Sequence, residues 1–241
     1  MSEEIPWKKF AVEGFVIVAS ILLAFGIDAW WQERQERQFE QEALVGLQEE
    51  YRGHRDMLAR HKSLHDEIVR AVEILMKACE RGYYEPDQIP IDRALYLSRL
   101  PPTADLGDGV AASLISSGRI EILSNRVLRH EITGWKSVLD ELVDGQLTAG
   151  DAIMGLMIPY LTRNGIPLMS FTSPLGVTPN LPDGRSLAAD NEAMQRLFSD
   201  PEYLSILESR YGGLVHTADE LDRVIAAIDS ILEEIDASLA N

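Results

Sequence analysis

The stretch from residue 10 to residue 31 reads FAVEGFVIVASILLAFGIDAWW and decides the architecture. At about 1.5 Å of rise per residue, a helix of this length reaches across the roughly 30 Å hydrocarbon core of a bilayer. Trp30 and Trp31 close the stretch, where interfacial aromatic side chains belong. The pattern predicts a transmembrane helix over residues 10–31, preceded by a short tail of residues 1–9.

Two other interpretations of this stretch stay open. Lys8 and Lys9 form a basic start and residues 24–26 read Ala-Phe-Gly, which together resemble a cleaved signal peptide. A buried helix of a soluble protein is the other alternative. The tryptophan pair and the helical pattern that continues without a break after Trp31 favour the membrane anchor.

Glu13 is an acid one turn inside the predicted span. It follows Lys9 by four residues, so the two side chains can pair near the interface. Alternatively, Glu13 contacts a polar group on a partner's span, since acids within a membrane are costly and commonly functional. Glu13, Trp30 and Trp31 are therefore candidate contacts with the lipid bilayer or with a partner.

Residues 32–241 have the composition of an acidic protein in water. They carry −15 of the formal net charge of −17. The negative electrostatic field of this part of the chain repels nucleic acid and attracts a basic protein surface as a partner. The lone cysteine, Cys79, excludes an intrachain disulfide.

Helical periodicity dominates this part of the chain. A polar stalk, QERQERQFEQE, begins at Gln32, and the helical pattern ends near Arg81, before Gly82. The predicted buried positions of this first long helix follow one another in alternating steps of three and four residues. They are Leu44, Leu47, Tyr51, His54, Leu58, His61, His65, Ile68, Val72, Leu75 and Cys79.

A second long helix is predicted from Pro201, with Asp200 as its N-cap. Its predicted buried positions are Leu204, Leu207, Tyr211, Leu214, Ala218, Leu221, Ile225, Ile228, Leu232, Ile235 and Leu239. A third helix is predicted after Ser124 or Asn125, with a kink or an interruption near residues 145–151, where glycines weaken it.

Shorter elements separate these helices. We expect a short helix over 91–100, another that Asp108 caps and that runs to about Ser117, and a break at Gly118. Residues 165–185 are rich in proline and predict a long loop. The chain is therefore predicted to be all-α: a transmembrane helix that continues into a stalk and an antiparallel helical bundle, which itself could pair with a second copy.

Three histidines on the first long helix are unusual. His61 and His65 are four residues apart, the spacing of two metal ligands on one helix face, and a third ligand such as His130 or His216 would be needed. His54, His61 and His65 could instead form a buried cluster that responds to pH. In the remaining interpretation Met57 and Leu64 are buried and the histidines lie at the rim.

No catalytic or cofactor-binding motif is present in the sequence. It lacks a phosphate-binding loop, a Cys-x-x-Cys pair, a Gly-x-Ser-x-Gly elbow and the Glu-x-x-His pairs of di-iron bundles. We therefore expect a non-enzymatic protein without a cofactor. The accessory or structural subunit of a membrane complex is the favoured function, and an extracytoplasmic ligand-binding or sensing bundle is the alternative.

Several motifs resemble a family of bacterial proteins of unknown function that have one N-terminal span and a helical remainder. The resemblance covers roughly residues 8–145 and rests on Glu13-Gly14, Gly26 to Trp30, the charged run 32–37, Ser113 to Gly118, Ile120 to Leu123, and Asn125. It implies the bacterial inner membrane as the location and supplies no catalytic residues. The short N-terminal tail, which contains Lys8 and Lys9, is expected to stay inside, so the large C-terminal domain is predicted to be periplasmic.

Overall fold

The structure is a computed structural model that describes residues 7–85, 89–101, 103–104, 106–107, 109–166 and 191–240, with side chains from Phe15 onward except that of Asn191. Every regular element in these ranges is helical, which confirms the predicted all-α class. The elements are α1 (Trp7–Arg81), α2 (Ile91–Leu97), α3 (Val110–Ser116), the 3₁₀ helix η1 (Arg119–Ile122), α4 (Arg126–Ala152), the π-helix η2 (Ile153–Met157), α5 (Ile158–Arg163), α6 (Asn191–Ser199) and α7 (Pro201–Leu239).

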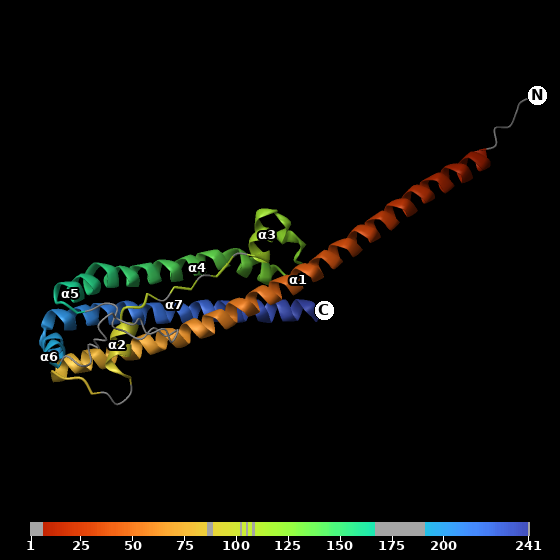
Figure 1. The fold of residues 1–241 in the computed structure, drawn as a ribbon. Coiled ribbons are helices and arrows are strands. Elements are labelled where there is room, and N and C mark those ends of the chain that lie inside the picture. The colour runs from red at the N-terminus through yellow and green to blue at the C-terminus, as the bar shows by residue number, and fades with distance from the viewer. Residues whose placement is uncertain are drawn as a thin grey trace, which may run out of the picture.

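Helix α1 is one continuous rod of 75 residues, and its N-terminal part projects away from the other helices (Figure 1). Every side chain from Phe15 to Phe39 is exposed, and Leu44 is the first that is buried. Among the described residues, α1 is the one helix long and apolar enough to cross a membrane. We call the end of the bundle where α1 leaves it the stalk end, and the opposite end the far end.

Helix α7 runs antiparallel to α1, and a ladder of polar pairs fixes their register. Gln48 bonds Asp236, Arg55 bonds Asp229 at 2.6 Å, and Lys62 bonds Asp222. The α1 members are seven residues apart, as are the α7 members. This is the repeat at which two helices in heptad packing present the same flank to each other.

The ladder gives a first prediction. Replacing Arg55 by glutamate faces Asp229 with a like charge, so the free energy of unfolding should fall by about 0.5–1 kcal/mol, the scale of a half-exposed pair. Adding Asp229→Arg should restore it. Urea denaturation of the two variants measures both steps, and failure of the double variant to recover would show that the pair does not set the register.

Helix α4 runs parallel to α1, because Ser124 contacts Glu40 at one end and Gln146 contacts His61 further along. The chain therefore has to return from the far end to the stalk end before α4 begins. We call the described residues between 98 and 109 the strap. They bridge the two ends between α1 and α4, with Ala104 bonded to Gln146 and Gly107 bonded to His54, and Ala104 and Leu106 are buried. Of the three long helices, α7 is the one that lies antiparallel to both others.

Apolar side chains form two separate cores. The stalk-end core joins α1, α4 and α7 through residues such as Leu58, Trp135 and Ile228. The far-end core includes Leu75, from α1, and Phe198, from α6. Polar side chains are buried in the section of the bundle where the two cores meet, and the candidate site lies there.

The buried face of α7 differs in part from the predicted one. Leu207, Leu214, Leu221, Ile228 and Ile235 are buried as predicted. The other half of the face lies one residue earlier than predicted, at Tyr203, Arg210, Thr217, Val224 and Ile231. Leu204, Ile225 and Leu232 are only half-buried, so their apolar side chains misled the assignment.

Helix ends and breaks follow local chemistry. Asn125 accepts from Val127 N–H and Leu128 N–H, and Asp200 accepts from Glu202 N–H, which confirms both predicted N-caps. The α4 interruption is a π-helix at 153–157, not a kink at 145–151. Pro159 explains the shift, because its ring lacks an N–H and crowds the carbonyl four residues back, which widens the preceding turn.

Two predicted features, the cap at Asp108 and the loop over 165–185, lie wholly or mostly outside the residues that the structure describes. Asp108 lies outside the described residues, and the carboxylate of Glu50, from α1, accepts the N–H groups of Gly109, Val110 and Ala111 at the start of α3. Apart from Gly165 and Ile166, the predicted loop over 165–185 also lies outside them.

Candidate functional site

Polar side chains form a layer between the two apolar cores. His65, Gln146, Arg210, Thr217 and Glu220 are all buried. His61 is half-buried beside them. We call these six residues, contributed by α1, α4 and α7, the polar layer. Buried polar groups are retained where hydrogen bonds or function require them, so this layer is the leading candidate for a functional site.

Gln146 connects the strap to α1. Its Oε1 accepts from Ala104 N–H at 2.9 Å, and its Nε2 lies 3.1 Å from Nε2 of His61. A backbone N–H can only donate, which fixes the orientation of the Gln146 amide and makes its Nε2 a donor. Nε2 of His61 must therefore be unprotonated and accept, so this contact exists only while the ring is neutral.

His65 is fully buried, and neither ring nitrogen has a hydrogen-bond partner among the described residues. Burial lowers its pKa to about 4, and the neighbouring His61 and Arg210 add to that effect. A histidine kept neutral in the folded state stabilises the fold above its unfolded pKa, near 6.5. That contribution is lost as the pH falls from about 6.5 toward 4.

This gives a second prediction. Replacing His65 by leucine removes two unpaired nitrogens and one acid-labile group, so the free energy of unfolding at pH 7 should rise by about 1–2 kcal/mol. Stability should also fall less between pH 6.5 and 4.5 than in the unmodified chain, by about 2 kcal/mol. Urea denaturation across that range measures both, and an unchanged pH dependence would contradict the assignment.

Arg210 is a buried cation held by backbone carbonyls. Its Nε donates to Ser98 O at 3.4 Å, its Nη1 to Ala149 O at 3.1 Å and its Nη2 to Leu100 O at 2.7 Å. Burial lowers its pKa to about 10. Ser98 and Leu100 lie just beyond α2, where carbonyls lack helical partners, so Arg210 joins the C-terminal end of α2 to α4 and α7.

A groove of about 660 Å³ runs between α4 and α7 beside the polar layer, with Arg210 and Glu220 among its lining residues. Oε1 of Glu220 lies 3.1 Å from Nε2 of His216, whereas Oε2 has no hydrogen-bond partner among the described residues. A Cβ on Gly145 would lie 2.0 Å from that Oε2. The glycine therefore gives the buried carboxylate its room.

The histidines are not at the rim. His54 and His65 are buried, whereas Met57 is exposed and Leu64 is half-buried. The interpretation in which Met57 and Leu64 are buried in place of the histidines was therefore wrong. The three also do not form one cluster. His54 donates from Nε2 to Gly107 O at 3.1 Å and stacks on Trp135 in the stalk-end core, while His61 and His65 belong to the polar layer.

The metal-ligand interpretation of His61 and His65 gains no support. Within the described ranges, no three His, Cys, Asp or Glu side chains come together in a way that could hold a metal ion. His216 instead pairs with Glu220 at the groove, and His130 is exposed.

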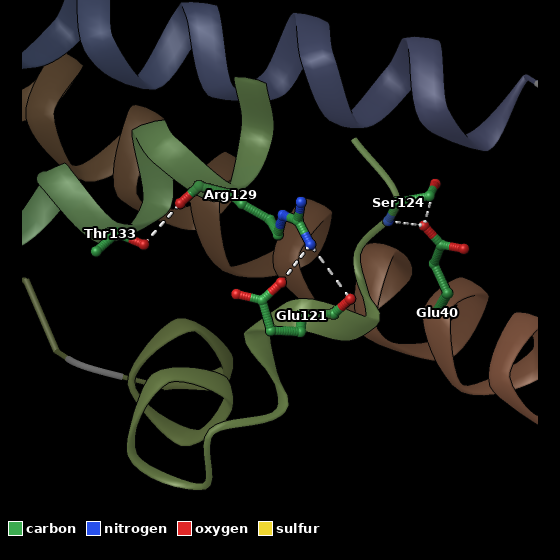
Figure 2. Close-up of polar contacts among 5 residues, drawn as sticks. All are labelled: Glu40, Glu121, Ser124, Arg129 and Thr133. Atoms are coloured by element: carbon green, nitrogen blue, oxygen red, sulfur yellow. Dashed lines mark hydrogen bonds and ion pairs between the residues drawn. The ribbon is translucent and has the colours of Figure 1, made fainter. Parts of the chain in front are cut away.

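A second feature is the junction at the stalk end, where Figure 2 shows Glu40 of α1 and the turn that precedes α4. Oε1 of Glu40 accepts from both the N–H and the hydroxyl of Ser124, each at 2.6 Å. Arg129 of α4 donates to the Glu121 carboxylate at 2.6 Å, and Thr133 donates to Arg129 O. These contacts hold η1 and α4 against the start of the buried part of α1.

The candidate membrane contacts lie on the projecting part of α1. Trp30 and Trp31 are 55% and 54% exposed, and among the described residues their printed ring contacts are with each other and with Arg34 of the same helix. The Glu13 side chain lies outside the described residues, although its backbone belongs to α1.

No protein-family model, curated protein or solved structure matches this chain. The resemblance of residues 8–145 to a bacterial family with one N-terminal span therefore stays a prediction.

Proposed function

We propose that this protein is a membrane-anchored, non-enzymatic interaction subunit: α1 holds it in the bacterial inner membrane and presents the acidic bundle to a partner in the periplasm. The observation that carries the proposal is the continuity of α1. A fully exposed apolar helix at one end runs without a break into the buried side of a bundle at the other.

The exposure pattern supports membrane insertion over burial in a soluble core. From Phe15 to Phe39 no described side chain is buried, and that segment includes Leu22, Leu23 and Phe25, each at least 64% exposed. A contiguous apolar surface of this kind is stable in lipid or against another apolar helix, and aggregates in water. A partner that packs on this part of α1 in place of lipid would be another integral membrane protein or a second copy of this chain.

The test is affinity purification of the full chain from native membranes in mild detergent, with mass spectrometry of what accompanies it. We expect integral membrane proteins in fixed ratio, or a homo-oligomer that persists in detergent. A variant with Glu13→Gln and the pair Trp30 and Trp31 changed to leucine tests the predicted contacts. Recovery of a bare monomer at high protein concentration would refute the proposal.

One observation favours a second candidate function, a ligand-sensing bundle that acts through a partner. The groove between α4 and α7 lies within the volume range of small-molecule sites and has the buried carboxylate of Glu220 among its lining residues. A thermal-shift screen of the full chain in detergent tests it. A stabilising ligand whose effect is lost in Glu220→Gln supports this function, and a screen without any such ligand counts against it.

A further inference from the structure

The strap is anchored to the bundle at separate points along its length. At the far end Arg210 holds the carbonyls of Ser98 and Leu100. At the stalk end His54 holds Gly107 O, and Glu50 holds the N–H groups that begin α3. Between them, Ala104 N–H is held by Gln146, which is itself bonded to His61.

We propose that the chain Ala104–Gln146–His61 is an acid-sensitive clamp: protonation of His61 breaks its contact with Gln146 and releases the middle of the strap from between α1 and α4. This inference rests on the hydrogen-bond geometry of the polar layer and is independent of the proposed membrane function.

The reason is donor and acceptor matching. The amide oxygen of Gln146 accepts the N–H of Ala104, so only the N–H groups of the amide can bond to His61. A protonated imidazole has no acceptor, and two donors would then face each other at 3.1 Å. Gln146 can rotate its amide to satisfy His61 only by turning its oxygen away from Ala104, which leaves that backbone N–H unpaired in a buried position.

The surroundings of the His61 ring determine how readily it is protonated. His61 itself faces the neutral Gln146 of α4 and lies beside His65, one turn further along α1; the charges of Lys62 and Asp66 on α1 and of Arg210 on α7 act on His65. Burial lowers the pKa of His61, and burial together with His61 and Arg210 lowers that of His65. The clamp is therefore closed at neutral pH and opens in acid, at a pH below the ordinary histidine pKa, when His61 takes up a proton.

The anchors at the two ends of the strap do not depend on His61. Arg210 stays charged throughout this range, because burial lowers its pKa only to about 10. Release is therefore expected to be local: the strap loosens around Ala104 while α1 and α7 keep their ladder of polar pairs.

The experiment is hydrogen–deuterium exchange with mass spectrometry on the full chain in detergent, at pH 7.5 and pH 5, with rates corrected for the intrinsic effect of pH. Peptides covering residues 98–107 should lose about tenfold more protection at pH 5 than peptides covering 221–235, the equivalent of one lost buried hydrogen bond beyond the global loss of stability that His65 causes. Equal protection of the strap at both pH values would overturn the proposal.

Variants separate the clamp from general acid sensitivity. His61→Gln keeps an acceptor oxygen for Gln146 but does not titrate, so the strap should stay protected at pH 5. His130→Gln removes an exposed histidine and should respond to acid like the unmodified chain. An acid response of His61→Gln equal to that of the unmodified chain would refute the role of His61.

Should His61→Gln fail to fold, Gln146→Met supplies the second variant. It lacks the bridging amide, so the strap should exchange fast at both pH values. Full protection of the strap at pH 7.5 in this variant would also overturn the proposal.

Discussion

Replacing Arg210 by methionine should lower the free energy of unfolding by about 3 kcal/mol. Three carbonyls, of Ser98, Ala149 and Leu100, lose charge-assisted hydrogen bonds, and leaving each unpaired costs about 1–3 kcal/mol. Removing the buried cation offsets part of this loss of stability. Burial disfavours the charged guanidinium by about 3 kcal/mol, judged from a pKa lowered to about 10. The unpaired carbonyls dominate the balance.

Urea denaturation of the full chain in detergent measures this loss. Arg223→Met is the matched control, since Arg223 lies on the same helix and lines the same groove, but its side chain is 60% exposed. That control should change stability by less than about 0.5 kcal/mol. Equal stability of the Arg210 and Arg223 variants would mean that the carbonyls find other donors once the guanidinium is gone.

Placing two arginines at Leu22 and Leu23 should release the chain from the membrane. Both leucines are exposed in the middle of the apolar part of α1, and each arginine there costs about 3–4 kcal/mol relative to leucine on the insertion scale. We expect the unmodified chain in the pellet after alkaline carbonate extraction and a large part of the variant in the supernatant.

The control adds the same charge to the same helix outside the apolar part, with arginine at Gln35 and Gln41, both of which are exposed. It should stay in the pellet. Mass measurement of the purified chain distinguishes an anchor from a cleaved leader, because the anchor is retained to the first residue. An intact, unmodified chain that is freely soluble without detergent would refute the membrane span.

Much of the fold was predictable because the apolar repeat is regular. On α1 the spacing from Leu44 to Leu75 placed the buried face correctly, and the caps Asn125 and Asp200 marked where α4 and α7 begin. Local chemistry decides these features, so the sequence alone contains them.

The polar layer was predictable only in part. His61 and His65 stood out as histidines on an apolar face, but Gln146, Arg210, Thr217 and Glu220 were missed because none of them was among the predicted buried positions. A signal existed: Tyr203, Arg210, Thr217, Val224 and Ile231 recur every seven residues and form half of the buried face. The partners of Arg210 could not be found that way, because they are backbone carbonyls of the strap and of α4 that only the folded chain brings together.

The continuity of α1 has a mechanical consequence. From Trp31 to Arg81 the rod measures roughly 75 Å at about 1.5 Å per residue, so a change of about 10° in its direction would sweep the far end through about 13 Å. No residue with unusual backbone angles interrupts this helix within the described part. A tilt of its N-terminal segment would therefore move the bundle with it as one rigid body. A partner that tilts that segment would steer α5 and α6 without touching them.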